Sequence, residues 1–561
     1  MSRTSTALGR ALRHTLPAVV LTAALPAALA AQETHGAHGG HGAHAPAAAH
    51  VGRAPLLKGM GNHHHRITTS SSEAQRYFDQ GLSLTYAFNH QEARRSFREA
   101  ARLDPRCAMC EWGAALVLGP NINAPMDTAA NAEAYAGAQR ALALAGGATS
   151  RERAYVEALT ERYAAAATPN RAALDSAYAR AMGRVAARYP DDADAATLFA
   201  EAQMDLSPWA YWAKDTTPLP GTPELLGALD RALRINRNHP GACHYYIHAV
   251  EAVYPERAVA CAERLAALIP AAGHIVHMPA HIYLRVGRYA DAIAANEHAV
   301  RADKRYITEQ GVQGFYPIAY YPHNHHFLAF AATMGGRREK AVSAARAAAA
   351  TTPVEVANGV PELQLLVAYP HLTLATFGRW SELLREPLPA VDLPLASGLA
   401  WYARGLAYAA RGEPAAARAA LVRVKAAAAT TTTYPGQPVL QIATHVLAGE
   451  IATRAGDRAR ATAELQAAAR VEDGLSYMEP PYWHQPVRHR LGAALLASGR
   501  AVDAERLFRE DLARFPENVW SLRGLERSLA ARGERAAAAA VRERYARAAR
   551  GADIVLSSSR F

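Results

Sequence analysis

The sequence is poor in several residues and patterns that would point to particular classes of protein. Only four of its 561 residues are cysteine, and five of its 61 basic residues are lysine. No block of five or more lysines and arginines occurs, so the net charge of +11 is a weak indication of nucleic-acid binding. Apart from one stretch near the N-terminus, no run of about 18 apolar residues occurs, which excludes a protein with several membrane spans.

Signature motifs of common enzyme classes are also absent. The chain contains no Gly-x-Gly-x-x-Gly, no phosphate-binding loop, no Gly-x-Ser-x-Gly and no His-Glu-x-x-His. Nucleotide binding, hydride transfer and serine hydrolysis therefore have no support in the sequence. Half of the residues are hydrophobic, 20% are charged, and stretches of Ala, Leu, Arg and Glu recur. This composition favours helices packed around a core.

Residues 1–31 have the pattern of a secretory signal peptide. Arg3, Arg10 and Arg13 precede an apolar run, and Ala28-Leu29-Ala30 matches a cleavage site between small residues. We therefore expect the mature protein to be exported, to the periplasm or the exterior, with no membrane span after cleavage. An oxidising compartment would permit disulfides.

Residues 32–66 are rich in His, Gly and Ala, and this composition predicts a disordered tail because it cannot form a core. Histidine-rich tracts can bind metal loosely. A plain solubilising linker is the alternative interpretation.

From about residue 74 to 549, apolar residues recur at helical spacing in blocks separated by short turns, with a period near 34 residues. Counted from Ala74, an aromatic residue stands at position 4, small residues at 8, 20 and 27, an aromatic at 24 and proline at 32. These residues are Tyr77, Gly81, Ala93, Ala100, Phe97 and Pro105. The pattern resembles that of the tetratricopeptide repeat family.

A second window, counted from Gln485, follows the same pattern at Gly492, Ala504, Phe508 and Pro516, with Arg488 as a departure at position 4. The resemblance implies an all-α, right-handed superhelical solenoid of about eleven or twelve helix hairpins. It also implies a concave face, lined by the first helix of each hairpin, that holds ligands. Stacking is required because one hairpin cannot bury its apolar face alone.

The predicted organisation is an N-terminal array over residues 67–303, an insertion loop over 304–322, a C-terminal array over 323–549 and a tail over 550–561. We expect the insertion, and a tight loop at residues 119–123, to lie near the groove.

Histidines are concentrated in the middle of the repeat array. His274, His277 and His281 follow i, i+3, i+7 spacing on one helix face. His244 and His248 stand 33 residues before His277 and His281, and the next hairpin carries His323 and His326. The resemblance places these seven residues on or close to concave positions of three consecutive hairpins.

Seven imidazoles in one groove predict a transition-metal site. Neutral imidazole suits Zn, Cu, Fe or Ni, and nearby Glu251 and Glu201 could serve as further ligands or as partners of the ligands. The chain would then be a metal carrier or a metalloenzyme, with metal ligands His244, His248, His274, His277, His281, His323, His326, Glu251 and Glu201.

The alternative function is a protein-interaction scaffold, which binds a peptide or protein partner in the concave groove without metal. The resembled family commonly has this role. Histidines would then be polar groove lining only.

The cysteines form two pairs. Cys107 and Cys110 form Cys-x-x-Cys at a predicted helix start, for which a local disulfide is the favoured interpretation in an exported protein. Cys243 and Cys261 lie on either side of a predicted turn, and we expect a second disulfide between them. No histidine follows the Cys-x-x-Cys, so haem attachment has no support.

Overall fold

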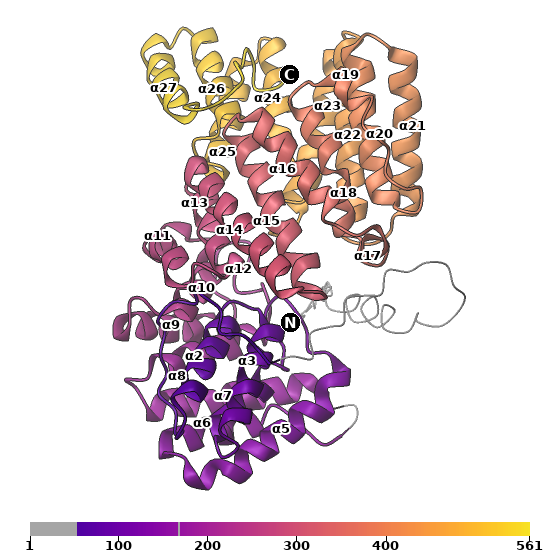
Figure 1. Cartoon of the computed structure of the whole chain (residues 1–561). Helices are drawn as coiled ribbons and strands as arrows, with labels where there is room; N and C mark the ends of the chain where they lie inside the picture. Colours follow the sequence, from indigo (N-terminus) through magenta and orange to yellow (C-terminus); the bar gives the residue numbers. More distant parts are fainter. Residues whose placement is uncertain (1–52, 167–168) are drawn as a thin grey trace, which may run out of the picture.

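A computed structural model describes residues 53–166 and 169–561. Over these residues the chain is helical, and its only β-type pairings are isolated bridges in two loops. The helices form consecutive antiparallel hairpins that stack into an elongated solenoid (Figure 1). The predicted all-α solenoid is confirmed.

The N-terminal half of the solenoid is drawn from indigo to magenta in Figure 1. Its helices are α2 (Ser72–Tyr86), α3 (His90–Leu103), α4 (Ala108–Leu116), α5 (Asn131–Leu144), α6 (Ser150–Thr160), α7 (Arg171–Arg188), α8 (Ala193–Met204), α9 (Thr222–Ile235), α10 (Pro240–Val250), α11 (Val259–Leu268), α12 (Gly273–His277), α13 (Pro279–Arg285) and α14 (Tyr289–Gln310).

The C-terminal half continues the stack to the yellow end of the chain. Its helices are α15 (Phe315–Met334), α16 (Arg338–Ala350), α17 (Val354–Gly359), α18 (Leu363–Thr376), α19 (Trp380–Leu383), α20 (Pro394–Ala410), α21 (Pro414–Thr430), α22 (Gly436–Arg454), α23 (Arg458–Gly474), α24 (Val487–Ala497), α25 (Ala501–Arg514), α26 (Val519–Ala531) and α27 (Arg535–Ala548).

The repeat pattern works by placing glycine against aromatic rings. Phe97 of α3 is fully buried, and a Cβ atom added at Gly81 or Gly113 would lie 2.7 or 2.4 Å from its ring. Phe508 of α25 is held in the same way between Gly492 and Gly524. Because these glycines lack a side chain, the ring of one helix fits between its two neighbours, and the hairpins stack closely.

Two segments that we predicted to be loop or tail are ordered. Of the predicted insertion at 304–322, only residues 311–314 lie outside α14 and α15. The hydroxyl of Tyr316 and the amide of Asn324 donate hydrogen bonds to buried Asp303, which joins the two helices. In the C-terminal tail, Asp553 accepts the backbone N–H groups of Arg338 and Glu339 and so caps α16.

The N-terminal segment also departs from expectation. Residues 53–66 pack on the solenoid instead of forming a disordered tail: the Tyr77 hydroxyl donates to the Ala54 carbonyl at 2.8 Å, and Met60 and His65 are buried. The predicted signal peptide and residues 32–52 of the predicted tail lie outside the described residues. No helix in the described ranges is long and apolar enough to cross a membrane.

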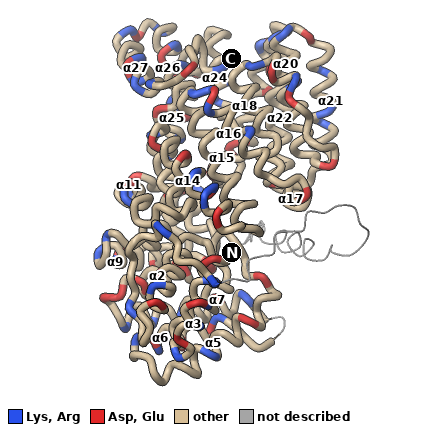
Figure 2. The backbone as a smooth tube through the Cα atoms, in the orientation of Figure 1, with Lys and Arg blue, Asp and Glu red and all other residues tan. Residues whose placement is uncertain are grey.

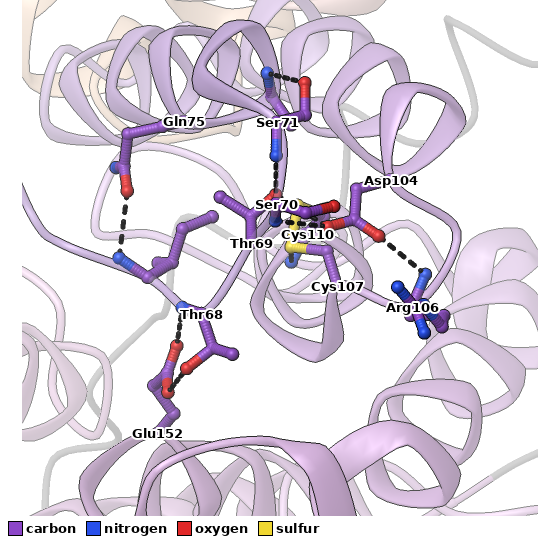
Figure 3. The surroundings of a disulfide bond; sticks show 12 residues. Thr68, Thr69, Ser70, Ser71, Gln75, Asp104, Arg106, Cys107, Cys110 and Glu152 are labelled. Atoms are coloured by element: carbon purple, nitrogen blue, oxygen red, sulfur yellow. Dashed lines mark hydrogen bonds between the residues drawn. A yellow bond between two sulfur atoms is a disulfide. The ribbon is translucent and has the colours of Figure 1, made fainter.

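Cys107 and Cys110 form the predicted disulfide at the start of α4. Figure 3 shows the adjoining segment, where the Thr69 hydroxyl donates to Asp104 at 2.7 Å. The predicted bridge between Cys243 and Cys261 is wrong, because both are buried free thiols. Each sulfur has another polar neighbour, the Arg237 carbonyl for Cys243 and the Arg264 guanidinium for Cys261.

Charged residues of both signs are interspersed along the two halves of the chain (Figure 2). Several are paired across neighbouring helices, such as Arg346 with Glu382 and Glu386. The distribution of charged residues along the backbone therefore agrees with the absence of a basic block in the sequence.

Candidate metal centre

Six histidines gather in the middle of the solenoid in two sets of three. The first set is His244 and His248 from α10 with His274 from α12, and the second is His277 from α12, His281 from α13 and His323 from α15. Within each set, one nitrogen of every ring lies within 4.8 Å of the others. All six are buried except His323, which is half-buried.

The division into two sets follows from helix dimensions. His274, His277 and His281 lie on one stripe, as their spacing predicts, but seven residues of helix extend about 10 Å. That length exceeds the reach of one metal ion with bonds of about 2 Å. His274 therefore meets α10, whereas His277 and His281 meet α15.

Five of the six rings, all except His323, approach another ring of their set through Nε2. His244 Nε2 lies 3.1 Å from both His248 Nε2 and His274 Nε2, and His277 Nε2 lies 2.9 Å from His281 Nε2. Nitrogen atoms at this separation point to a common centre.

The opposite ring nitrogens of His244 and His277 face hydrogen-bond acceptors, whereas the buried Nδ1 of His274 has no hydrogen-bond partner. His244 Nδ1 donates to the Tyr86 carbonyl at 2.7 Å, and His277 Nδ1 donates to Asn296 Oδ1 at 2.7 Å. The Asn296 amide nitrogen donates to the Ala292 carbonyl, which fixes the orientation of that amide. A proton on Nδ1 leaves the lone pair on Nε2 free.

Glu251 contacts one histidine of each set. Its Oε1 lies 3.3 Å from His248 Nδ1, and its Oε2 lies 2.7 Å from His281 Nδ1. Glu479, from the loop after α23, adds a second carboxylate 3.3 Å from the same His281 nitrogen. Both carboxylates therefore lie behind the rings and orient them.

Burial keeps most of these rings neutral. It holds the pKa of each of five histidines well below 6.5, and neighbouring histidines lower the pKa further; the five are His244, His248, His274, His277 and His323. Burial also acts to lower the pKa of His281, but Glu251 and Glu479 outweigh it and raise that pKa to about 9. The neutral rings each present a lone pair, the form that binds metal.

Aromatic side chains cover both sets. Phe88, a residue with φ of 55°, stacks on His248 and His274 with ring centroids 6.1 and 5.6 Å away. Phe327 packs on His277 and His281 at 4.5 and 4.4 Å. These rings exclude water from the faces of the histidines that they cover.

The loop at residues 119–123 lies beside the first histidine set. Its Ile122 carbonyl accepts a hydrogen bond from the indole of Trp209, which packs on His248. The amide of Asn123 donates to the hydroxyl of Tyr320, which packs on His274.

Two of the residues proposed from the sequence lie elsewhere. His326 stands three residues after His323 on α15 but packs against Tyr369. Glu201 lies beside Asp205, and its carboxylate is 4.0 Å from the buried Arg162. Glu251 is close to the histidines, but on their Nδ1 side.

Sequence reasoning missed Phe88, Asn296 and Glu479. Asn296 stands 19 residues after His277, a separation typical of residues that face each other across the two helices of a hairpin. The repeat pattern could therefore have predicted this contact. Glu479 lies about 200 residues downstream in a loop, and no spacing pattern points to it.

A third group of histidines surrounds Asp194 on α8. His63 Nε2, His65 Nδ1 and His239 Nε2 lie 2.8 to 3.0 Å from its two oxygens, and the Tyr86 hydroxyl donates to it at 2.6 Å. These contacts fasten the N-terminal segment to α2, α8 and α10.

No family model matches the chain, and no curated protein matches its sequence. Similar solved structures include human IFIT1 in a dimer with m7Gppp-AAAA, at 14% identity and a TM-score of 0.34 over 86% of this chain and 91% of that one. Yeast Tom70 shares 11% identity at a TM-score of 0.30 over 83% of this chain and 90% of its own. The likeness extends to the general fold alone.

Proposed function

We propose that the protein binds two transition-metal ions, one in each set of three histidines. The observation that carries the proposal is the approach of Nε2 atoms to 2.9–3.1 Å in both sets, while Nδ1 of His244 in the first set and of His277 in the second faces an acceptor. Two lone pairs at that distance repel each other, so a proton or a metal ion lies between them. In the second set the raised pKa of His281 lets that ring supply the proton when no metal is bound, and the metal ion replaces it.

The spacing of the nitrogens fits a metal ion. Bonds of about 2.0–2.1 Å at tetrahedral angles place two imidazole nitrogens about 3.3 Å apart. The separations of 2.9 and 3.1 Å require only a small adjustment of the rings. Carboxylate and carbonyl partners on Nδ1 are the usual supports of metal-bound histidine.

The Asp194 group differs in which ring nitrogen carries the proton. His239 Nδ1 accepts the backbone N–H of Ala242 at 3.1 Å, so its Nε2 carries the proton and donates to Asp194. A nitrogen that carries a proton has no lone pair for a metal. We therefore assign this group a structural role.

Burial supports resident ions rather than a cargo that exchanges freely. His244 and His277 have no exposed surface, and their Nδ1 partners hold them in place. The same burial puts these rings beyond the reach of a peptide. A scaffold role is a separate hypothesis about the rest of the solenoid. Export to the periplasm or the exterior is a further hypothesis, which depends on residues 1–31.

The test is the metal content of the tag-free chain and its variants, measured by elemental analysis. His248→Ala should remove the ion of the first set, and His277→Ala the ion of the second. His326→Ala is the matched control, because this histidine is buried nearby but belongs to neither set. Equal metal content in all three variants and the parent would contradict the proposal. Metal that binds loosely to the N-terminal histidines is present equally in every variant and therefore does not affect the comparison.

A further inference from the structure

We infer that the two histidine sets hold copper, loaded as a pair of monovalent ions. The inference rests on the proposed function and deepens it by naming the metal. Three features carry it: the absence of carboxylates from the two histidine sets, the charge around the sets and the apolar cover.

The ligands themselves supply no negative charge. Among the described residues, the carboxylates of Glu251 and Glu479 are the only ones that lie with any of these six rings in a group able to hold a metal ion. Arg285 lies 3.7 Å from Glu479 and offsets part of that charge. The surroundings of both sets thus carry one to two negative charges in total.

Uncompensated charge is costly in a buried site. Two divalent ions would bring four positive charges to this centre, whereas two cuprous ions bring two. All six residues are buried or half-buried, so water cannot supply the missing compensation. The charge balance therefore favours monovalent ions.

The coordination number points the same way. Each set offers three nitrogens, whereas structural zinc takes four protein ligands and non-haem iron commonly includes a carboxylate. Three histidines hold zinc in catalytic sites, where water is the fourth ligand. Phe88 and Phe327 present carbon, not oxygen, to the two sets. Cuprous ion accepts three neutral nitrogen ligands, and imidazole is among the ligands that suit copper.

The two sets are close enough for the ions to form a pair. The rings of His248 and His281, one from each set, have centroids 5.6 Å apart, and those of His274 and His277 are 6.1 Å apart. Glu251 contacts both sets. Two one-electron metal ions would thus lie side by side in one buried centre.

The experiment is an anaerobic titration of the metal-free full chain with Cu(I), in competition with a chromogenic Cu(I) chelator. A parallel titration uses Zn(II) with a zinc-binding dye. We expect Cu(I) to fill both sets and to bind at least tenfold more tightly than Zn(II). His248→Ala and His277→Ala should each lose one Cu(I) relative to His326→Ala.

A second arm tests the charge argument. Glu479→Gln removes one carboxylate and should weaken Zn(II) binding more than Cu(I) binding. Equal losses for the two metals would overturn the argument, as would tighter binding of Zn(II) than Cu(I) in the parent chain. Those results leave the proposed function standing. Binding of either metal that is unchanged by both histidine substitutions would instead overturn the proposed function.

Discussion

Glu251 Oε2 lies 2.7 Å from Nδ1 of His281, while its other oxygen accepts from His248 of the neighbouring set. One buried carboxylate thus supports a ring in each of the two sets. The same arrangement distinguishes Glu251 from Glu479, which contacts only His281 among the six rings.

We expect Glu251→Gln to weaken metal binding in both sets, by about 10–100-fold, the usual effect of losing a partner of a metal-bound histidine. Glu479→Gln is the matched control and should affect the second set alone. Competition titrations of the two variants measure this difference. If Glu251→Gln weakens metal binding in one set only, the contact of Glu251 with the other set has no effect on metal binding.

The stacking of hairpins gives a prediction about stability. In Gly524→Ala, the new Cβ would lie 2.3 Å from the ring of Phe508, which is fully buried between two helices. Overpacking of this kind lowers the free energy of unfolding by about 1–3 kcal/mol.

Gly227→Ala is the control, because Gly227 is an exposed residue within α9 and no atom lies within 4 Å of its added Cβ. Alanine favours helix over glycine by up to about 1 kcal/mol, so this variant should be unchanged or more stable. Thermal unfolding of both variants measures the contrast, and a stable Gly524→Ala chain would contradict the packing described for Phe508.

Attachment of the N-terminal segment should depend on pH. Burial acts to raise the pKa of Asp194, but His63, His239 and His65 outweigh it and hold that pKa well below 3.8. Burial acts to lower the pKa of His65, and Asp194 outweighs it and raises that pKa above 6.5. Ionised Asp194 therefore stabilises the attachment of the N-terminal segment above pH 3.8, and this stabilisation is lost as pH falls through the pKa of Asp194 in the folded protein.

Protonated His65 stabilises the same attachment with the opposite pH dependence. Its stabilisation is complete below pH 6.5 and is lost as pH rises through the pKa of His65 in the folded protein. Protection of residues 62–66 against hydrogen exchange, corrected for the intrinsic rate, should therefore be greatest at mildly acidic pH and fall above about 6.5. His65→Ala should abolish that fall. Protection that is constant from pH 5 to 8 in the parent would rule out the ion pair.

The cysteines give a chemical test. Cys107 and Cys110 are bridged, whereas Cys243 and Cys261 are free and buried. Thiol titration of denatured, unreduced protein should find two thiols, and reduction should raise the number to four. An unreduced chain without free thiols would show that the second pair also becomes oxidised.

Much of the fold could be predicted from the sequence, because the signals were local. Tyr77, Gly81 and Phe97 stand at repeat positions, and the structure shows why a glycine faces an aromatic ring there. The spacing of His244 and His248, and of His277 and His281, likewise fixed which rings share a helix face.

Only the tertiary structure decided how those faces combine. Helix geometry placed His323 and His326 together on one helix, but packing turned one toward His277 and the other toward Tyr369. It also brought Glu479 to His281 from a distant loop. Local spacing is set by the 3.6-residue turn, whereas the choice of neighbours depends on burial summed over the whole solenoid.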